Sequence, residues 1–488
     1  MHPLQPHSPH DDEPQAPWRS PWSMDDDAPP LRAYRQPSPP RPELPRAPEP
    51  VRRVAPPPAP ARIDPREAPP PGQWNRLIVV TFMAFMGLFM AWAYLRDEER
   101  PQDSDLRPEA PCLTGVRPAA LELWQSALQS ATFPGPSDAV LKPTWEWDTP
   151  TLSRTVEANR TTWSALESAL RESDWQPQNP AWRSPEVGGH DQWEALGTAC
   201  NALIAYLSRK GEEKSAFQAA LDVATLGRRL QTISSWPTYY NHGLRLQQRA
   251  SESLAELLRS TQLDGRTLNV MQATFERSQP EDAQLRDALN GFYQFERVLF
   301  TGLRKDDPWD MLPGGLAVQT QQRSRWFFKP YATLELFTKA FRGLKSEVVK
   351  PPYAWADHLV RVVGPAGRPL DSSGALNYAG GLYANQRLWP YAQLLENHAL
   401  QRTRHLMVLT LFAVRSYGAN QSRAPLALAD LKPLYFTSLP VDPFSGESLG
   451  YDSARGLIFS VGLDYKSERG NPLPVPMSDP YEPTLRIR

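Results

Sequence analysis

The residues whose types could do chemistry are few, and the first are two histidines on one helical stretch. His398 and His405 lie seven residues apart, with Glu396 close to the first of them. Imidazole and carboxylate groups are zinc ligands, but about two helical turns separate the two rings, so they could share a metal ion only with a ligand from a further helix. The chain also has no Gly-x-Ser-x-Gly elbow, no phosphate-cradling glycine loop and no Cys-x-x-Cys pair. We therefore assign no catalytic and no cofactor-binding residue, and expect packed or surface roles for the histidines.

The two cysteines are a second candidate for chemistry. Cys112 and Cys200 both come after a long apolar run in the chain, so they lie on the same side of a membrane if that run spans one. In an oxidising compartment the pair could form one disulfide, which would stabilise the fold by about 4 kcal/mol because it closes a long loop. Alternatively the two thiols are unrelated, and Cys200 is packed in the apolar helix GTACNALIAYL.

The apolar run, from Leu77 to Leu95, is the strongest signal in the sequence. Its 19 residues carry no charge, and as a helix they would rise about 28 Å, which matches the hydrocarbon core of a bilayer. Trp74 and Trp92 lie near its ends, where aromatic rings favour the membrane interface. We predict a transmembrane helix over residues 74–96 rather than a buried core helix, and expect no cleavage as a signal peptide because a long segment precedes the run.

The orientation of this span rests on weaker signals. Three arginines lie within about 20 residues of it on each side, so the positive-inside comparison is a tie. Further arginines in the N-terminal segment favour a cytoplasmic N-terminus, and an anchor of that orientation exports the part of the chain on its C-terminal side. We therefore expect a single-pass protein of the bacterial inner (cell) membrane, with a cytoplasmic N-terminus and an extracytoplasmic C-terminal domain.

Residues 1–73, before the span, hold 23 of the 53 prolines in the chain. A segment with so many prolines and so few large apolar side chains cannot bury enough surface to offset its chain entropy, so we expect a disordered Pro-rich tail. The whole chain has 53 Lys and Arg against 54 Asp and Glu, and this balance gives no basic field for nucleic acid. We expect the bilayer and other envelope proteins as partners, and no nucleic acid.

From about residue 116 the apolar pattern has the period of a helix. Two amphipathic runs that are broken at Gly211 predict a helical hairpin, and Ser278 with Glu281 has the spacing of a capping box at the start of another helix. We predict a mainly α fold, a helical-hairpin bundle or short solenoid over residues 116–390, joined to the span by a linker over residues 97–115.

The last part of the chain, residues 391–488, is predicted to combine a long helix with a small β module. In the turn at DPFSG, Gly446 permits a positive φ, and the turn SARG (Ser453–Gly456) joins two short apolar strands into a hairpin. An isolated hairpin is barely stable in water, so its apolar side chains need a surface. The nearest is the apolar helix from Leu406 to Val414, and we expect the module to cap the helical domain there.

Several residues of this C-terminal stretch carry a resemblance to known proteins. They are Asp442, Pro443, Phe444, Gly446, Leu449, Tyr451, Ser460, Val461, Gly462, Asp464, Lys466 and Gly470. The stretch resembles the C-terminal half of type II secretion major pseudopilins. It is even more similar to the pseudopilin-like module of large, helical, membrane-anchored bacterial proteins of the planctomycete type, whose usual ending is DPF-x-G-x-P-L-x-Y … YSVGPDGKDDGG. The resemblance implies a module of this fold on an envelope protein.

The resemblance also implies one candidate cofactor. The pseudopilin segment that corresponds to DGKDDGG binds calcium, and this chain reads DYKSERGN there, with carboxylates at Asp464 and Glu468. These two side chains are the candidate calcium ligands, and the alternative is a solvated turn. Pseudopilins further require a glutamate five positions after a processed glycine. Here the fifth residue after Gly72 is Leu77, so we expect neither processing nor assembly into a pilus.

Three function classes are consistent with these observations. The first is a membrane-anchored extracytoplasmic scaffold or protein-interaction module of the bacterial envelope, which the span, the helical hairpins and the lack of catalytic motifs favour. The second is an accessory component of a type II secretion or pilus-like machine, which the C-terminal resemblance favours. The third is an envelope enzyme whose site the sequence motifs do not reveal.

Overall fold

The computed structural model describes most of the chain after residue 70. The described residues are 71–95, 99–107, 119–133, 142–173, 175, 190–233, 237–302, 329–355, 358–364, 377–464 and 483–487. The predicted Pro-rich tail lies outside these residues as far as residue 70. The chain folds into two compact units. One contains the first helix, and the other contains the elements after it. We call the second the helical unit.

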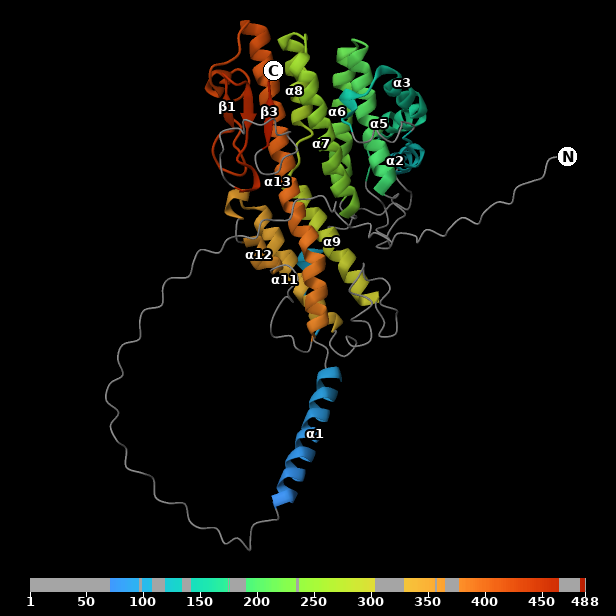
Figure 1. Ribbon diagram of the computed structural model, residues 1–488, viewed down its shortest axis with the longest axis vertical. Coiled ribbons are helices and arrows are strands. Elements are labelled where there is room, and N and C mark those ends of the chain that lie inside the picture. Colours follow the sequence, from blue (N-terminus) through green and yellow to red (C-terminus); the bar gives the residue numbers. More distant parts are fainter. Residues whose placement is uncertain are drawn as a thin grey trace, which may run out of the picture. The chain divides into compact units, whose positions relative to one another are not determined.

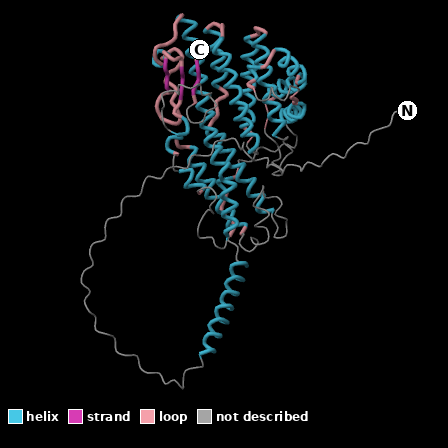
Figure 2. The backbone as a smooth tube through the Cα atoms, in the orientation of Figure 1, coloured by secondary structure: helices cyan, strands magenta, loops and turns pink. Residues whose placement is uncertain are grey.

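The described part is mainly helical with one small antiparallel sheet, which confirms the predicted fold class at this level (Figures 1 and 2). The helices are α1 (Pro71–Leu95), α2 (Ala119–Ser130), α3 (Thr149–Ala158), α4 (Arg160–Arg171), α5 (His190–Arg209), α6 (Glu213–Gln231), α7 (Pro237–Ser260), α8 (Gly265–Glu276), α9 (Asp282–Gly302), α11 (Pro330–Val348), α12 (His358–Val363) and α13 (Tyr378–Gln421). The strands are β1 (Gly450–Asp452), β2 (Leu457–Phe459) and β3 (Thr484–Arg486).

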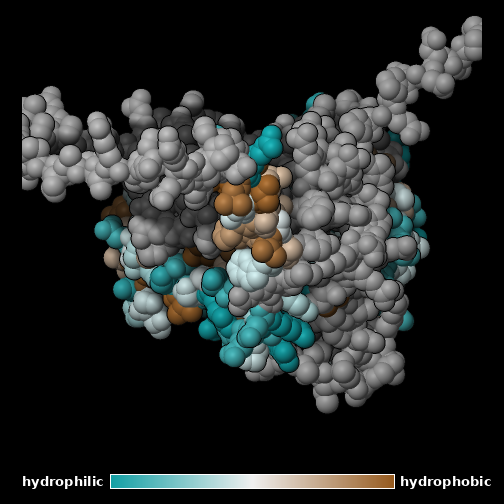
Figure 3. All heavy atoms as spheres, turned by 90° about the horizontal axis from the view of Figure 1, so that it is seen from below, coloured by the Kyte–Doolittle hydropathy of each residue, from teal (hydrophilic) through white to brown (hydrophobic). Residues whose placement is uncertain are grey.

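Helix α1 coincides with the apolar run. Among the described residues it is the one helix long and apolar enough to cross a membrane, over Asn75–Trp92, and no part of that window is buried. Its large apolar side chains are exposed, and they form the brown cluster at the centre of Figure 3. Such a surface is unfavourable in water, because monomeric soluble proteins rarely expose contiguous apolar patches of this kind.

The predicted hairpin at Gly211 is present between α5 and α6. Gly211 has a φ of 78°, which glycine adopts without strain, and it turns the chain between Arg209 and Glu213. The next pair, α6 and α7, packs more closely still. A Cβ atom on Gly227 would lie 2.6 Å from the backbone oxygen of Gly243. A Cβ atom on Gly243 would likewise lie 2.6 Å from the backbone oxygen of Gly227. The two glycines therefore permit the close crossing of α6 and α7.

The predicted capping box at Ser278 is wrong. The Ser278 hydroxyl donates a hydrogen bond of 2.6 Å to the carbonyl oxygen of Phe275 at the end of α8. Ser278 thus closes the preceding helix, and its carbonyl accepts from the side chain of Gln247 on α7. Helix α9 begins at Asp282, with the first backbone bonds accepted by Glu281.

Helix α13 is the long axis of the helical unit. It packs against α7, α8 and α11 along its length, and Figure 1 shows it running between the sheet and the other helices. The helix predicted over the apolar stretch is present, but it begins at Tyr378 and crosses the predicted boundary between residues 390 and 391. The reason is that the segment before this boundary is helical too, and Pro390 lies inside the helix.

The sheet covers the C-terminal half of α13. Its order is β1-β2-β3, with Tyr451 opposite Ile458 and Ile458 opposite Leu485. Ile458 and Leu485 are fully or almost fully buried in one core cluster with Phe412 of α13. The predicted hairpin of β1 and β2 and its packing on the apolar helix are therefore confirmed. Strand β3 was not predicted from the sequence.

Residues 99–107, shortly after α1, belong to the helical unit and pack on its helices α9 and α11. In the predicted linker over residues 97–115, the described stretch 99–107 includes the short 3₁₀ helix η1 (Ser104–Leu106). Asp103 is 3% exposed and forms an ion pair with Arg297 of α9 at 2.8 Å. Asp105 pairs with Arg342 of α11 at 2.7 Å, and the Arg342 hydrogen bond holds the pKa of Asp105 below its usual range. This part of the linker is therefore fixed by charge pairs.

Candidate functional site

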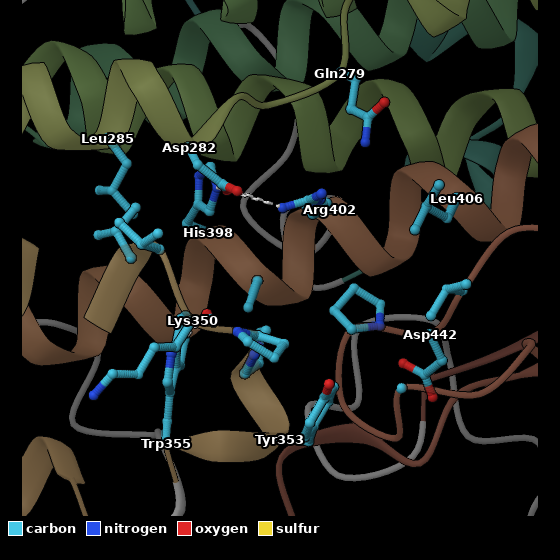
Figure 4. A pocket seen from close by; sticks show the side chains of 18 residues that line it. Gln279, Asp282, Leu285, Lys350, Tyr353, Trp355, His398, Arg402, Leu406 and Asp442 are labelled. Carbon is cyan, nitrogen blue, oxygen red and sulfur yellow. Dashed lines mark hydrogen bonds and ion pairs between the residues drawn. The ribbon is translucent and has the colours of Figure 1, made fainter. Parts of the chain in front are cut away.

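A cleft of about 460 Å³ lies where four segments of the helical unit meet. Its lining comes from the start of α9, from the connection between α11 and the 3₁₀ helix η6 (Pro352–Ala354), from the middle of α13 and from the turn at residues 441–446. Figure 4 shows Asp282, His398 and Arg402 on one side of the cleft and Tyr353 and Asp442 on the other. The volume is in the range of sites that hold a small ligand or a few residues of a peptide.

A chain of hydrogen bonds forms the polar side of the cleft. The Tyr240 hydroxyl lies 2.8 Å from Nδ1 of His398, and Nε2 of His398 lies 3.1 Å from Oδ1 of Asp282. A carboxylate only accepts, so Nε2 donates to Asp282 and Nδ1 accepts from Tyr240. Nη1 of Arg402 then donates to both oxygens of Asp282 at 2.9 Å. The carboxylate of Asp282 is thus shared between an imidazole and a guanidinium group.

The protonation of these groups depends on their surroundings. Burial lowers the pKa of His398, and the hydrogen bond from the ring to Asp282 opposes this effect without cancelling it. For Asp282, burial raises the pKa, but the His398 hydrogen bond and the Arg402 charge outweigh it and hold the pKa below its ordinary value. The cleft therefore contains a neutral imidazole beside an ionised carboxylate at neutral pH.

This arrangement favours binding over catalysis. Both ring nitrogens of His398 are engaged, and the residue is 3% exposed, so it has no free lone pair to take a proton from a ligand. The other histidine of the sequence pattern lies elsewhere in the core. His405 stacks on Phe275 with ring centroids 4.1 Å apart, and burial lowers its pKa to about 3. Burial raises the pKa of Glu396 to about 7, and Glu396 is not among the residues that line the cleft.

The charges that a ligand could reach are mostly positive. The side chains of Arg402, Lys350 and Asp282 are 37, 42 and 43% exposed. The fourth charged residue that lines the cleft, Asp442, is only 2% exposed. Two exposed cations and one exposed anion therefore line the cleft.

The rim of the cleft is apolar. Outside α1, seven large apolar side chains are exposed in the described part of the chain, and three of them line this cleft. They are Val349, Tyr353 and Val441, with exposed fractions of 70, 49 and 54%. Such a concentration around one hollow is typical of a binding site rather than of scattered surface residues.

The turn at residues 441–446 is held in place by Asp442. One carboxylate oxygen accepts hydrogen bonds from the Phe444 backbone amide at 3.0 Å and the Ser460 hydroxyl at 2.8 Å, and the other accepts from the Val461 amide at 3.1 Å. These bonds connect the DPF turn to Ser460 and Val461 of the SVG segment. Asp442 therefore shapes the wall of the cleft and is not available to a ligand.

Gly446 completes this wall. Its φ is 74°, as the turn pattern predicted, and a Cβ atom there would lie 2.8 Å from a ring carbon of Tyr353. The C-terminal module thus approaches η6 closely at this point. The local sequence pattern predicts the turn but not its neighbour, because nothing in that pattern connects residues 353 and 446.

No protein-family model, curated protein or solved structure matches this chain. The resemblance to pseudopilin-like modules therefore stays a prediction.

The remaining candidate residues of the sequence analysis lie partly outside the described residues. Cys200 is buried in α5, and burial raises the pKa of its thiol to about 12, but Cys112 lies outside them, so the disulfide stays a prediction. Asp464 ends the 3₁₀ helix η9 (Gly462–Asp464), while its side chain and the whole of Glu468 are not described. The calcium site stays a prediction for the same reason.

Proposed function

We propose that the protein is a single-pass, membrane-anchored interaction module of the bacterial envelope. Helix α1 crosses the inner membrane, the N-terminus is cytoplasmic and the helical unit is extracytoplasmic. The observation that carries this proposal is the apolar surface of α1, which is exposed throughout Asn75–Trp92 and has the length of a bilayer core. A bilayer is the environment in which such a helix is stable without a protein partner.

The helical unit is the part of the protein that recognises a partner. Its cleft combines an apolar rim with charges of both signs, which is the composition of a recognition site. The helices that line the cleft are held by the buried core around α13 and by the ion pairs that bind η1 to α9 and α11. The protein in this account holds another envelope protein close to the membrane without changing it chemically.

One alternative is an accessory part of a type II secretion or pilus-like machine. The sheet that packs on the end of a long helix favours it, because this is the arrangement that the C-terminal resemblance implies. An envelope enzyme is the second alternative, and the His398–Asp282 hydrogen bond in a cleft favours it. It explains the site less well, since the imidazole is engaged at both nitrogens.

Extraction of membranes at alkaline pH tests the anchor. We expect the full chain to stay in the membrane pellet, and the double substitution Phe85→Arg with Leu88→Arg to release it, because each arginine near the middle of a transmembrane helix costs about 2.5–3.5 kcal/mol of insertion free energy. Val270→Arg, on the exposed surface of α8, is the matched control and should stay in the pellet. Retention of the double variant in the pellet would rule out α1 as the anchor.

A further inference from the structure

We propose that the cleft binds an extended peptide segment that places an acidic side chain next to an apolar one. This inference rests on the proposed function, since it names the chemistry that the interaction module recognises. It joins two features of the same hollow, namely its two exposed cations and the apolar residues on its rim.

The acidic side chain is drawn to donors that the fold leaves unused. The hydrogen bonds of Arg402 to Asp282 use Nη1, and its Nη2 makes none within the described part of the chain. Lys350 gives one hydrogen bond of 2.7 Å to Glu347, which leaves two further protons on Nζ. Both groups are more than a third exposed and line the same cleft. A carboxylate that reaches Nη2 of Arg402 gains a charge-assisted hydrogen bond, and Lys350, which points away from Arg402 in Figure 4, adds positive charge from the other side of the cleft.

The apolar side chain packs on the rim. Val349 follows α11 and Tyr353 lies in η6, whereas Val441 comes from the turn of the C-terminal module. A ligand that covers all three side chains removes their apolar surface from water, and this surface belongs to two separate segments of the chain. This burial contributes affinity in proportion to its area, and it requires the apolar group to lie beside the carboxylate.

A peptide fits this site better than an inorganic anion does. A phosphate group carries nearly two negative charges and is bound where several cations or backbone amides converge. Here the ionised carboxylate of Asp282 faces the same space as Arg402, so it repels a dianion. The same carboxylate can accept a hydrogen bond from a backbone N–H of a peptide. A site with two cations, one acceptor and an apolar rim therefore matches a peptide that has one acidic residue.

The test measures binding of blocked peptides to the full chain in detergent micelles by titration calorimetry. The probe is acetyl-Gly-Val-Pro-Glu-Gly-amide, and it is compared with the same peptide carrying Gln for Glu and with one carrying Ser-Gly for Val-Pro. We expect the Glu peptide to bind about tenfold more tightly than either variant, and its affinity to fall as salt is added, because the contact is between charges at the surface.

Variants of the protein locate the binding. Arg402→Gln and, separately, Lys350→Gln should each reduce the preference for the Glu peptide over the Gln peptide while keeping the preference for Val-Pro over Ser-Gly. Arg423→Gln, an exposed arginine outside the cleft lining, is the matched control and should change neither preference. Because Arg402 and Lys350 lie on different elements, a folding defect in one variant leaves the other variant to test the proposal.

Three outcomes would overturn the inference. They are equal affinity of the wild-type protein for the Glu and Gln peptides, tighter binding of inorganic phosphate than of the Glu peptide, and no binding of any peptide at millimolar concentration. Each of these rejects the peptide chemistry while the membrane retention of the full chain is unchanged. Loss of membrane retention, measured by alkaline extraction, rejects the proposed function itself, so the two failures are distinguishable.

Discussion

Replacing Ile458 by Ala is expected to lower the free energy of unfolding by about 2–5 kcal/mol. Ile458 is 0% exposed and lies in the centre of the sheet, where β2 pairs with both neighbours. Its side chain belongs to the same core cluster as Phe412 of α13, so the substitution leaves a cavity between the sheet and the helix. Urea denaturation of the full chain in a mild detergent, followed by tryptophan fluorescence, measures the change.

The control for this experiment is Leu434→Ala, whose side chain is 72% exposed and whose loss should change the unfolding free energy by less than about 0.5 kcal/mol. A chelator added to the wild-type protein separates the cap from the calcium hypothesis. If the module is mainly a cap, Ile458→Ala has the large effect and the chelator a small one. A chelator that unfolds the protein while Ile458→Ala leaves its stability unchanged would show that the stretch is a metal site instead.

Arg387→Met is expected to cost about 3–5 kcal/mol of unfolding free energy, because it removes the cation that pairs with the Glu296 carboxylate in the core. Glu296 is 0% exposed and accepts hydrogen bonds from Nε of Arg387 at 2.9 Å and from the Tyr391 hydroxyl at 2.7 Å. The methionine keeps most of the volume and apolar contact of the arginine stem, so the effect isolates the charge. The same urea denaturation measures it.

Two further variants make this result interpretable. The double variant Arg387→Met with Glu296→Gln removes both charges and should recover a large part of the lost stability. Arg160→Met is the matched surface control, because the Arg160–Glu157 pair is 80 and 70% exposed and such pairs contribute at most about 1 kcal/mol. Equal effects of Arg387→Met and Arg160→Met would contradict the importance of the buried pair.

The buried pair matters for the cleft because it fixes the two helices that form the polar side. Glu296 pairs with Arg387, and Asp282 pairs with Arg402 near the other end of the same contact between α9 and α13. The two ion pairs thus tie the helices together at two points. We expect loss of the Arg387–Glu296 pair to loosen α9 and α13, the helices that carry the polar side chains of the cleft.

The sequence predicted the local elements of this protein well. The apolar run of α1, the hairpin at Gly211, the strands β1 and β2 and the apolar face of α13 each arise from a short pattern of side chains. The boundaries were less accurate, since α13 begins at Tyr378 and α9 begins after a serine that closes α8. A residue suited to begin a helix can also end the previous one, and the local pattern does not distinguish these roles.

The cleft could not be predicted, because it is formed by contacts between distant parts of the chain. Asp282, Tyr353, Arg402 and Asp442 come from four segments that no periodicity or motif connects. Strand β3 was missed for a similar reason. It has three residues, and more than twenty residues of chain separate it from β2. Its pairing with β2 and the burial of Leu485 in the core therefore depend on tertiary contacts that no local pattern predicts.

Protease protection in spheroplasts tests the central claim most directly. The full chain carries one epitope tag before Met1 and another after Arg488, and protease is added to intact spheroplasts. The account predicts that the C-terminal tag is lost while a fragment containing the N-terminal tag and α1 is protected until the membrane is dissolved with detergent. A C-terminal tag that survives in intact spheroplasts and is digested after addition of detergent would contradict an extracytoplasmic helical unit.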